Sequence, residues 1–148
     1  MKLKVMLWVI SMAIAIILLL FYSNQKVKVI AGFQNKWTAT VIVDHLPLTN
    51  TGKIKWWQEH HHRIVMQYHL QPDNPRGYLS YYIYAFAEGY KANENEDRLC
   101  FNALPPPKNC IEKNLLMIVS RDRNGNTQIT IGNNVYSLDD TRTSDPAY

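Results

Sequence analysis

The sequence lacks the short motifs that mark the commonest kinds of catalytic site. It has no G-x-S-x-G nucleophile elbow, no phosphate-binding P-loop and no dinucleotide-binding fingerprint. Carboxylates gather at Glu94, Glu96 and Asp97 and again at Asp139 and Asp140, but in polar segments where solvation explains them. A general acid and base need separated environments within a cleft, which such segments do not indicate. We therefore predict a non-catalytic protein that holds no cofactor.

The sequence also lacks a concentration of basic residues. Its 16 Lys and Arg residues exceed its 12 Asp and Glu residues only enough to give a formal charge of +4. The basic residues beyond the N-terminal region are dispersed among acidic ones, whereas a nucleic-acid interface needs a basic patch or stripe. We therefore predict no nucleic-acid partner.

Cysteine is scarce, since the chain has only Cys100 and Cys110. In an oxidising compartment such a pair is most simply a disulfide, although two free buried cysteines are the alternative. No Cys-x-x-Cys motif or matched histidine spacing accompanies the pair, so metal binding by it is not expected. The pair is the one candidate covalent cross-link in the chain.

Metal-ligand spacing is missing from the histidines as well. His60, His61 and His62 are consecutive, and His69 follows further on. On a helix, successive side chains point about 100° apart, and residues 62 and 69 lie roughly 10 Å apart along the axis. The i, i+4 spacing of H-E-x-x-H is absent. We predict no metal site, with His61 partly packed between solvated His60 and His62.

One long hydrophobic run, Val5 to Tyr22, is the most prominent feature that the sequence does have. Its eighteen uncharged residues would form roughly 27 Å of helix, close to the thickness of a bilayer's hydrocarbon core. A cleaved secretory signal is the alternative, but its apolar core spans only about 7 to 15 residues and ends in a small-residue cleavage site. The sequence offers no such site, so we predict an uncleaved helix that crosses the lipid bilayer.

The charges that flank this run set the expected topology. Lys2, Lys4 and the terminal amine precede it, while Lys26 and Lys28 follow it. The positive-inside rule slightly favours a cytoplasmic N-terminus, which places the domain in the periplasm of a bacterium and the anchor in its inner membrane. The expected divisions are an anchor over residues 1–24, a periplasmic domain over 25–140 and a flexible tail over 141–148.

About 120 residues remain after the anchor, enough for one compact domain. Apolar residues at steps of three and four predict an amphipathic helix from Gly52 to His69. Alternating or β-favouring segments predict strands, and Asn124-Gly125 predicts a tight turn between two of them. The predicted strands are Lys26–Phe33, Trp37–Asp44, Tyr78–Phe86, Arg98–Phe101, Leu115–Arg121, Thr127–Ile131 and Val135–Leu138. The predicted fold class is α+β, with a small antiparallel sheet of about six strands covered by one amphipathic helix.

Aromatic residues provide the candidates for a binding site. Tyrosines crowd residues 78–90, and Trp56 lies off the apolar stripe to which Trp57 belongs. Tyr and Trp are enriched at protein interfaces because they bury a large area with few rotatable bonds. Core packing is the alternative, since a small sheet covered by one helix also needs bulky side chains. The candidate partner-binding residues are Trp56, Tyr78, Tyr82, Tyr84 and Tyr90.

Three segments of the chain match a pattern known from one family. They are Leu48 to Trp57, Gly89-Tyr90-Lys91, and Asp97 to Phe101 continuing into Pro106 to Asn114. With the N-terminal anchor, they make the chain resemble the enterobacterial putative membrane protein family, a domain of unknown function. The resemblance covers nearly the whole chain, and the segment between the cysteines is its most specific part. It implies a single-pass inner-membrane protein and transfers no catalytic residue.

These features together predict a single-pass inner-membrane protein with a non-catalytic periplasmic domain that binds a protein. The domain is small, anchored, rich in aromatic residues and able to form a disulfide. Our leading hypothesis is an immunity-type protein that neutralises a secreted toxin. The alternative is a structural or accessory envelope protein that docks on an inner-membrane complex.

Overall fold

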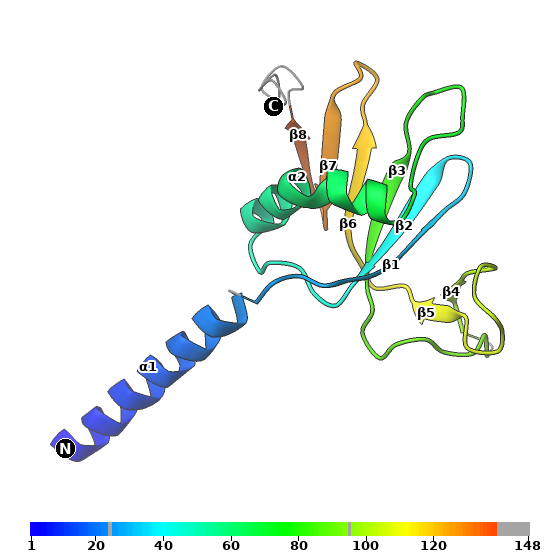
Figure 1. Ribbon diagram of the computed structural model, residues 1–148. Helices are drawn as coiled ribbons and strands as arrows, with labels where there is room; N and C mark the ends of the chain where they lie inside the picture. The colour runs from blue at the N-terminus through cyan, green and yellow to red at the C-terminus, as the bar shows by residue number, and fades with distance from the viewer. Residues whose placement is uncertain (24, 95, 139–148) are drawn as a thin grey trace.

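The structure, a computed structural model, describes residues 1–23, 25–94 and 96–138. Its first element is helix α1, Lys2–Ser23, which projects away from the rest of the chain (Figure 1). This helix is long and apolar enough to cross a membrane, and none of its most hydrophobic window is buried against the protein. The predicted apolar helix is confirmed and begins earlier, at Lys2. The predicted tail over 141–148, with Asp139 and Asp140, lies outside the described residues.

Six strands form the main sheet, in the order β1-β2-β3-β6-β7-β8, and two further strands, β4 and β5, pair separately. The predicted α+β class and sheet of about six strands are confirmed. The sequence did not predict β5, a strand of three residues that directly follows the proline-rich segment. The strands are β1 Val29–Gln34, β2 Thr38–Val43, β3 Ser80–Ala85, β4 Arg98–Cys100, β5 Cys110–Glu112, β6 Leu115–Arg121, β7 Thr127–Ile131 and β8 Asn134–Leu138.

The sheet is antiparallel, as predicted, except at β2 and β3, which pair in parallel. Parallel neighbours need a long crossover connection, and helix α2, Asn50–Gln67, supplies it. The side-chain oxygen of Thr49 accepts a hydrogen bond from the backbone N–H of Gly52 at 3.0 Å and so caps the start of α2. Because Thr49 fixes this start, the helix lies two residues earlier than the predicted range.

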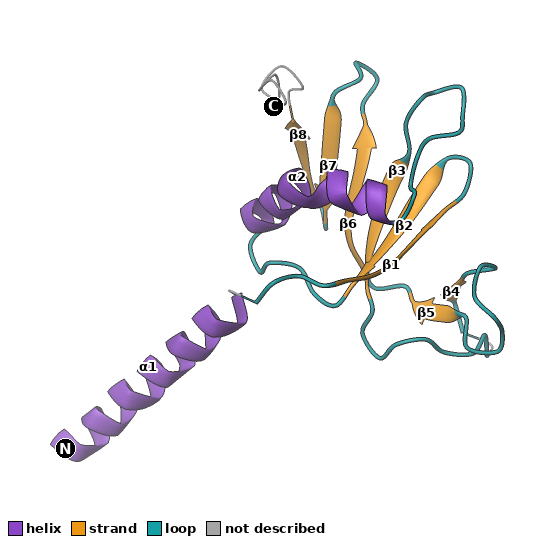
Figure 2. Ribbon diagram, viewed as in Figure 1, coloured by secondary structure: helices purple, strands orange, loops and turns teal. Residues whose placement is uncertain are grey.

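Helix α2 lies across one face of the main sheet, as Figure 2 shows. Trp57 is 4% exposed, and its ring centroid lies 5.0 Å from that of Tyr81 on β3. The predicted covering of the sheet by one amphipathic helix is therefore confirmed. Alternate strand residues supply the other side of this core, namely Ala39, Val41, Val43, Ile83, Met117, Val119, Ile129 and Ile131.

The described residues cover only part of the second face of the sheet. The cover is a lobe, residues 86–114, that contains β4 and β5 and packs Phe101 and Ile111 against Ile42 of β2. The ring of Phe101 also stacks on that of Phe33 at 4.2 Å. Toward β8 this face is more open, and Val135 is 56% exposed. The strand register aligns one row across this open part, formed by Tyr82, Ile118, Thr130 and Val135.

Candidate functional site

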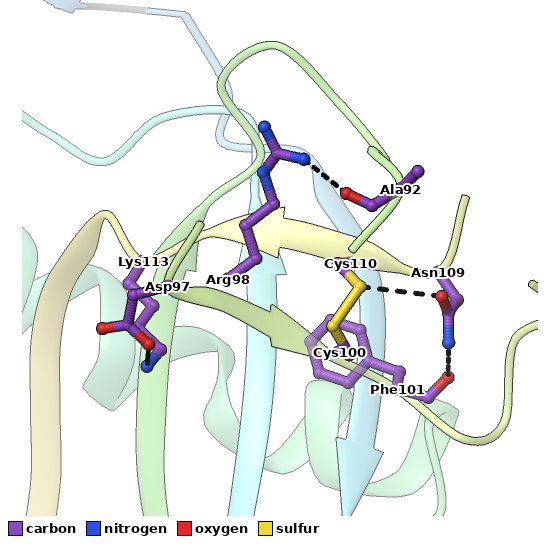
Figure 3. The surroundings of a disulfide bond; sticks show 8 residues. All are labelled: Ala92, Asp97, Arg98, Cys100, Phe101, Asn109, Cys110 and Lys113. Atoms are coloured by element: carbon purple, nitrogen blue, oxygen red, sulfur yellow. Dashed lines mark hydrogen bonds and ion pairs between the residues drawn. A yellow bond between two sulfur atoms is a disulfide. The ribbon is translucent and has the colours of Figure 1, made fainter. Parts of the chain in front are cut away.

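The two cysteines lie within the lobe. Cys100 ends β4 and Cys110 begins β5, and the two residues are directly opposite each other in the strand register. Their sulfur atoms lie 2.11 Å apart and form the bond drawn in Figure 3. The structure therefore has the predicted disulfide rather than two free thiols.

Ion pairs tie the loop between β3 and β4 to the rest of the lobe. Lys91 lies between two carboxylates. Its hydrogen bond to Glu112 has the largest effect in raising the pKa of its ammonium group, and its hydrogen bond to Glu88 raises that pKa further. Glu96 and Asp97, two of the carboxylates noted in the sequence, each pair with a cation of their own. This arrangement is typical of a structural network rather than of a general acid and base. The pairs are Lys91 with Glu88 and Glu112, Arg98 with Glu96, and Lys113 with Asp97.

The consecutive histidines of α2 contribute to the packing of the helix itself. The Nδ1 atoms of His60 and His61 donate to the backbone carbonyls of Trp56 and Trp57, at 2.8 and 3.1 Å respectively. His60 is partly buried rather than solvated, because its ring stacks on that of Trp56. Burial, and then repulsion from His62, lowers the pKa of His61, so this imidazole is neutral at pH 7. Within the described ranges, no three His, Cys, Asp or Glu residues are placed to hold a metal ion.

The five candidate partner-binding aromatics do not form one surface. Trp56 is 6% exposed and belongs to the core under α2, because the buried face of this helix is wide enough to include two consecutive tryptophans. Tyr82 and Tyr84 follow the second face of the sheet, and Tyr90 packs in the lobe. Tyr78 lies elsewhere, two residues before β3 begins and on the side of α2, so the predicted strand starts later than Tyr78.

The connection from α2 to β3, which contains Tyr78, lies at the end of the sheet that points away from α1, which we call the distal end (Figure 1). The side chain of Asn74 links two parts of this end by donating to the backbone carbonyl of Lys36 at 2.8 Å and to that of Tyr78 at 3.0 Å. The distal end comprises the β1–β2 turn (residues 35–37), the connection from α2 to β3 (residues 71–79), and the β6–β7 turn with its flanking arginine (residues 121–126).

Two aromatic rings of the distal end are each contacted by cations. Trp37 is 42% exposed, and the Arg76 guanidinium and the Lys36 ammonium lie 4.9 and 5.4 Å from its ring centroid. The Arg121 guanidinium lies 5.6 Å from the ring centroid of Tyr78. At exposed sites, each such cation–π contact stabilises the position of the cation over the ring by about 0.5–1 kcal/mol. The sequence placed Trp37 in a strand and missed this cluster, because its members come from three separate segments.

A cleft of about 830 Å³ opens beside Tyr78, between α2 and the sheet. Trp57, His61 and His62 line it from the helix. Burial raises the pKa of Tyr81, another lining residue, so its phenol stays protonated at neutral pH. No acidic side chain from the described part of the chain lines the cleft. Polar and aromatic lining residues from the strand side are Tyr78, Tyr81, Ser120, Arg121, Thr127 and Ser137.

The groups that line this cleft are suited to binding a ligand. Its aromatic rings, hydroxyls and one guanidinium can contact a bound ligand. The neutral His61 offers a further hydrogen-bond acceptor, Nε2, because its Nδ1 donates to the helix backbone. The sequence identified Tyr78 and His61 separately, on a strand and on a helix. Their placement along one cleft follows from the crossover of α2 over the sheet.

Comparison with known proteins identifies a family but no characterised relative. No curated protein and no solved structure matches the chain. Residues 1–144 match a family described as an enterobacterial putative membrane protein. That match covers the apolar helix, the main sheet and the lobe, and it agrees with a membrane protein that has one candidate span. The chain therefore belongs to the enterobacterial putative membrane protein family (DUF943).

Proposed function

We propose that this chain is a single-pass inner-membrane protein whose periplasmic domain binds a protein, as an immunity-type protein that neutralises a secreted toxin. Helix α1 supplies an apolar anchor, and Lys2 and Lys4 favour a cytoplasmic N-terminus. The Cys100–Cys110 disulfide supports the same orientation, since structural disulfides persist in oxidising compartments such as the periplasm.

The distal end is the observation that carries the binding function. Trp, Tyr and Arg are the residue types that dominate binding energy at protein interfaces. Here Tyr78 and Arg121 line the cleft, and Trp37 and Arg76 belong to the same distal end of the domain, which points away from α1 (Figure 1). A protein arriving from the space outside the membrane would meet this end first.

A competition assay tests the immunity hypothesis. Cells that lack this gene are grown with siblings that deliver a toxin encoded beside it, and the gene is returned as wild type, Trp37→Ser or Met66→Ser. Met66 is a matched control because it is an exposed apolar residue, 66% accessible, on the outer side of α2. We expect wild type and Met66→Ser to restore survival and Trp37→Ser to lose it. Equal survival of cells with and without the gene would rule out immunity.

A docking role on an inner-membrane complex is the second candidate. It is favoured by the short connection between the membrane and the domain, because α1 ends at Ser23 and β1 begins at Val29. This connection keeps the domain close to the bilayer. Docking predicts that the full chain is recovered from mild detergent with a defined membrane assembly, and recovery as a bare monomer would argue against it.

A further inference from the structure

We propose that the distal end takes an acidic, extended segment of the protein partner, with the carboxylates of that segment on Arg76 and Arg121 and its chain along the cleft. This inference rests on the proposed function and specifies the chemistry of the partner. It depends on three features of the distal end, which are its charge, the lining of the cleft and the length of the cleft.

The charge of the distal end is positive and is not neutralised by neighbouring acids in the described ranges. Arg76 and Arg121 contact aromatic rings, and neither forms an ion pair with a described carboxylate. In the lobe, by contrast, Lys91, Arg98 and Lys113 all have carboxylate partners. A guanidinium that lies over a ring still has N–H groups for a carboxylate, which it can bind in a bidentate manner.

Acidic residues are fewer than basic ones at the distal end. Asp122 uses its carboxylate within its own turn, where Oδ1 accepts from the backbone N–H groups of Asn124 and Asn126 at 2.8 and 2.9 Å. Asp73 is therefore the one described carboxylate of the distal end that does not hold its own turn in this way. The distal cations are Lys36, Arg76, Arg121 and Arg123, and the distal carboxylates are Asp73 and Asp122.

The lining of the cleft suits the backbone and side chains of a peptide. The phenol hydroxyl of Tyr78 can donate to peptide groups and the neutral imidazole of His61 can accept from them, while Trp57 and Tyr81 offer apolar surface. No described acidic side chain lines the cleft, so an acidic segment would meet no repulsion from the described side chains of its walls. The surface of a lipid bilayer is flat and, unlike a peptide, would not fill a concave site of about 830 Å³.

The cleft has the length of a short extended segment. Its lining residues come from four adjacent strands, with Tyr81 on β3, Ser120 on β6, Thr127 on β7 and Ser137 on β8. Strands lie about 4.8 Å apart, so four of them span roughly 14 Å, the length of about four residues of extended chain. A segment of this length could place carboxylates near Arg121 while it crosses the sheet.

Peptide binding to the full chain in a neutral detergent tests the inference. The probe is a fluorescently labelled octapeptide that alternates Glu and Ser, and its comparison is the same peptide with Gln in place of Glu. We expect the Glu peptide to bind and the Gln peptide to bind at least about tenfold more weakly. We also expect Arg76→Gln with Arg121→Gln to weaken the Glu peptide about three- to tenfold, the range of two exposed ion pairs.

Lys28→Gln with Lys108→Gln is the matched control. Both lysines are exposed and distant from the cleft, so this variant removes the same charge and should keep the affinity within about twofold. An equal loss in both double variants would show attraction to net charge alone and overturn the inference, as would equal binding of the Gln peptide. Binding of phosphatidylglycerol vesicles that depends on Arg76 and Arg121, with no peptide binding, would assign the surface to lipid instead.

These results are separable from the proposed function. Crosslinking of a protein at Tyr78 in cells, with no binding of the Glu peptide, would leave protein binding in place and refute an acidic segment. Circular dichroism of each variant confirms that its fold is kept, and Arg121→Lys should recover only part of the affinity because an ammonium cannot bind a carboxylate in a bidentate manner.

Discussion

Replacement of both Cys100 and Cys110 by serine should loosen the lobe while the main sheet stays folded. The disulfide joins β4 to β5, and the lobe contacts the sheet through a small cluster of its own, in which Phe101 and Ile111 pack on Ile42. The larger core under α2 contains none of these residues. The lobe can therefore open without exposing that core.

The size of the effect follows from the loop that the disulfide closes. A separation of 10 residues gives about 2.7 kcal/mol of stabilisation in the chain-entropy model. Pro105, Pro106 and Pro107 already restrict this loop, so we expect about 2 kcal/mol. A loss of that size raises the population of the open lobe roughly 30-fold.

Hydrogen exchange measured by mass spectrometry on the full chain in detergent can detect this change. Backbone amides that hold the lobe, including the N–H of Cys110 that donates to the carbonyl of Lys91 and the N–H of Phe101 that donates to that of Asn109, should exchange roughly 30-fold faster. Amides of β2 and β3 should be unchanged. Wild type treated with a reducing agent should reproduce the pattern. Faster exchange across the whole sheet, or unchanged exchange in the lobe, would refute this reasoning.

Three further predictions concern the stability of the domain. Gly32→Ala should lower the free energy of unfolding by about 1–3 kcal/mol in denaturant titrations, because the added Cβ would lie 2.7 Å from the Cβ of Tyr68. Unchanged stability would mean that the C-terminal end of α2 can shift away from β1 without cost. Thr49→Ala should cost about 1 kcal/mol through loss of the helix cap, and Thr49→Ser should cost much less. Burial lowers the pKa of His61, so protonation favours the unfolded chain, and the stability present above about pH 6.5 should fall as the pH drops below it. His61→Gln should flatten this dependence in thermal unfolding scans, and an unaltered slope would contradict the assignment.

Local patterns in the sequence predicted the elements that depend on local geometry. The bounds of β6 and β7 agree with the prediction, because the two segments are β-favouring and an Asn-Gly turn separates them. The disulfide was predicted from the pair of cysteines together with the expectation of an oxidising compartment. The parallel pairing of β2 with β3 was not predictable in this way, since it depends on the path of α2 across the sheet.

The candidate site shows the same division. Tyr78 was identified from its neighbourhood of tyrosines, and it does line the cleft. Trp56 was assigned to a surface because a narrow apolar stripe excludes it, whereas α2 buries a wider arc against the sheet. Trp37 and Arg121 acquire their relationship to Tyr78 only when three strand ends meet at the distal end, which no local pattern records.

Photocrosslinking in intact cells tests most directly whether the distal end binds a protein. A photoreactive phenylalanine analogue is placed at Tyr78 of the full chain, with Tyr82 on the open sheet face and Met66 on the outer side of α2 as comparison positions. We predict one discrete protein adduct at Tyr78 and none of comparable yield at Met66. Absence of an adduct at Tyr78, or adducts of equal yield at all three positions, would contradict protein binding by the distal end.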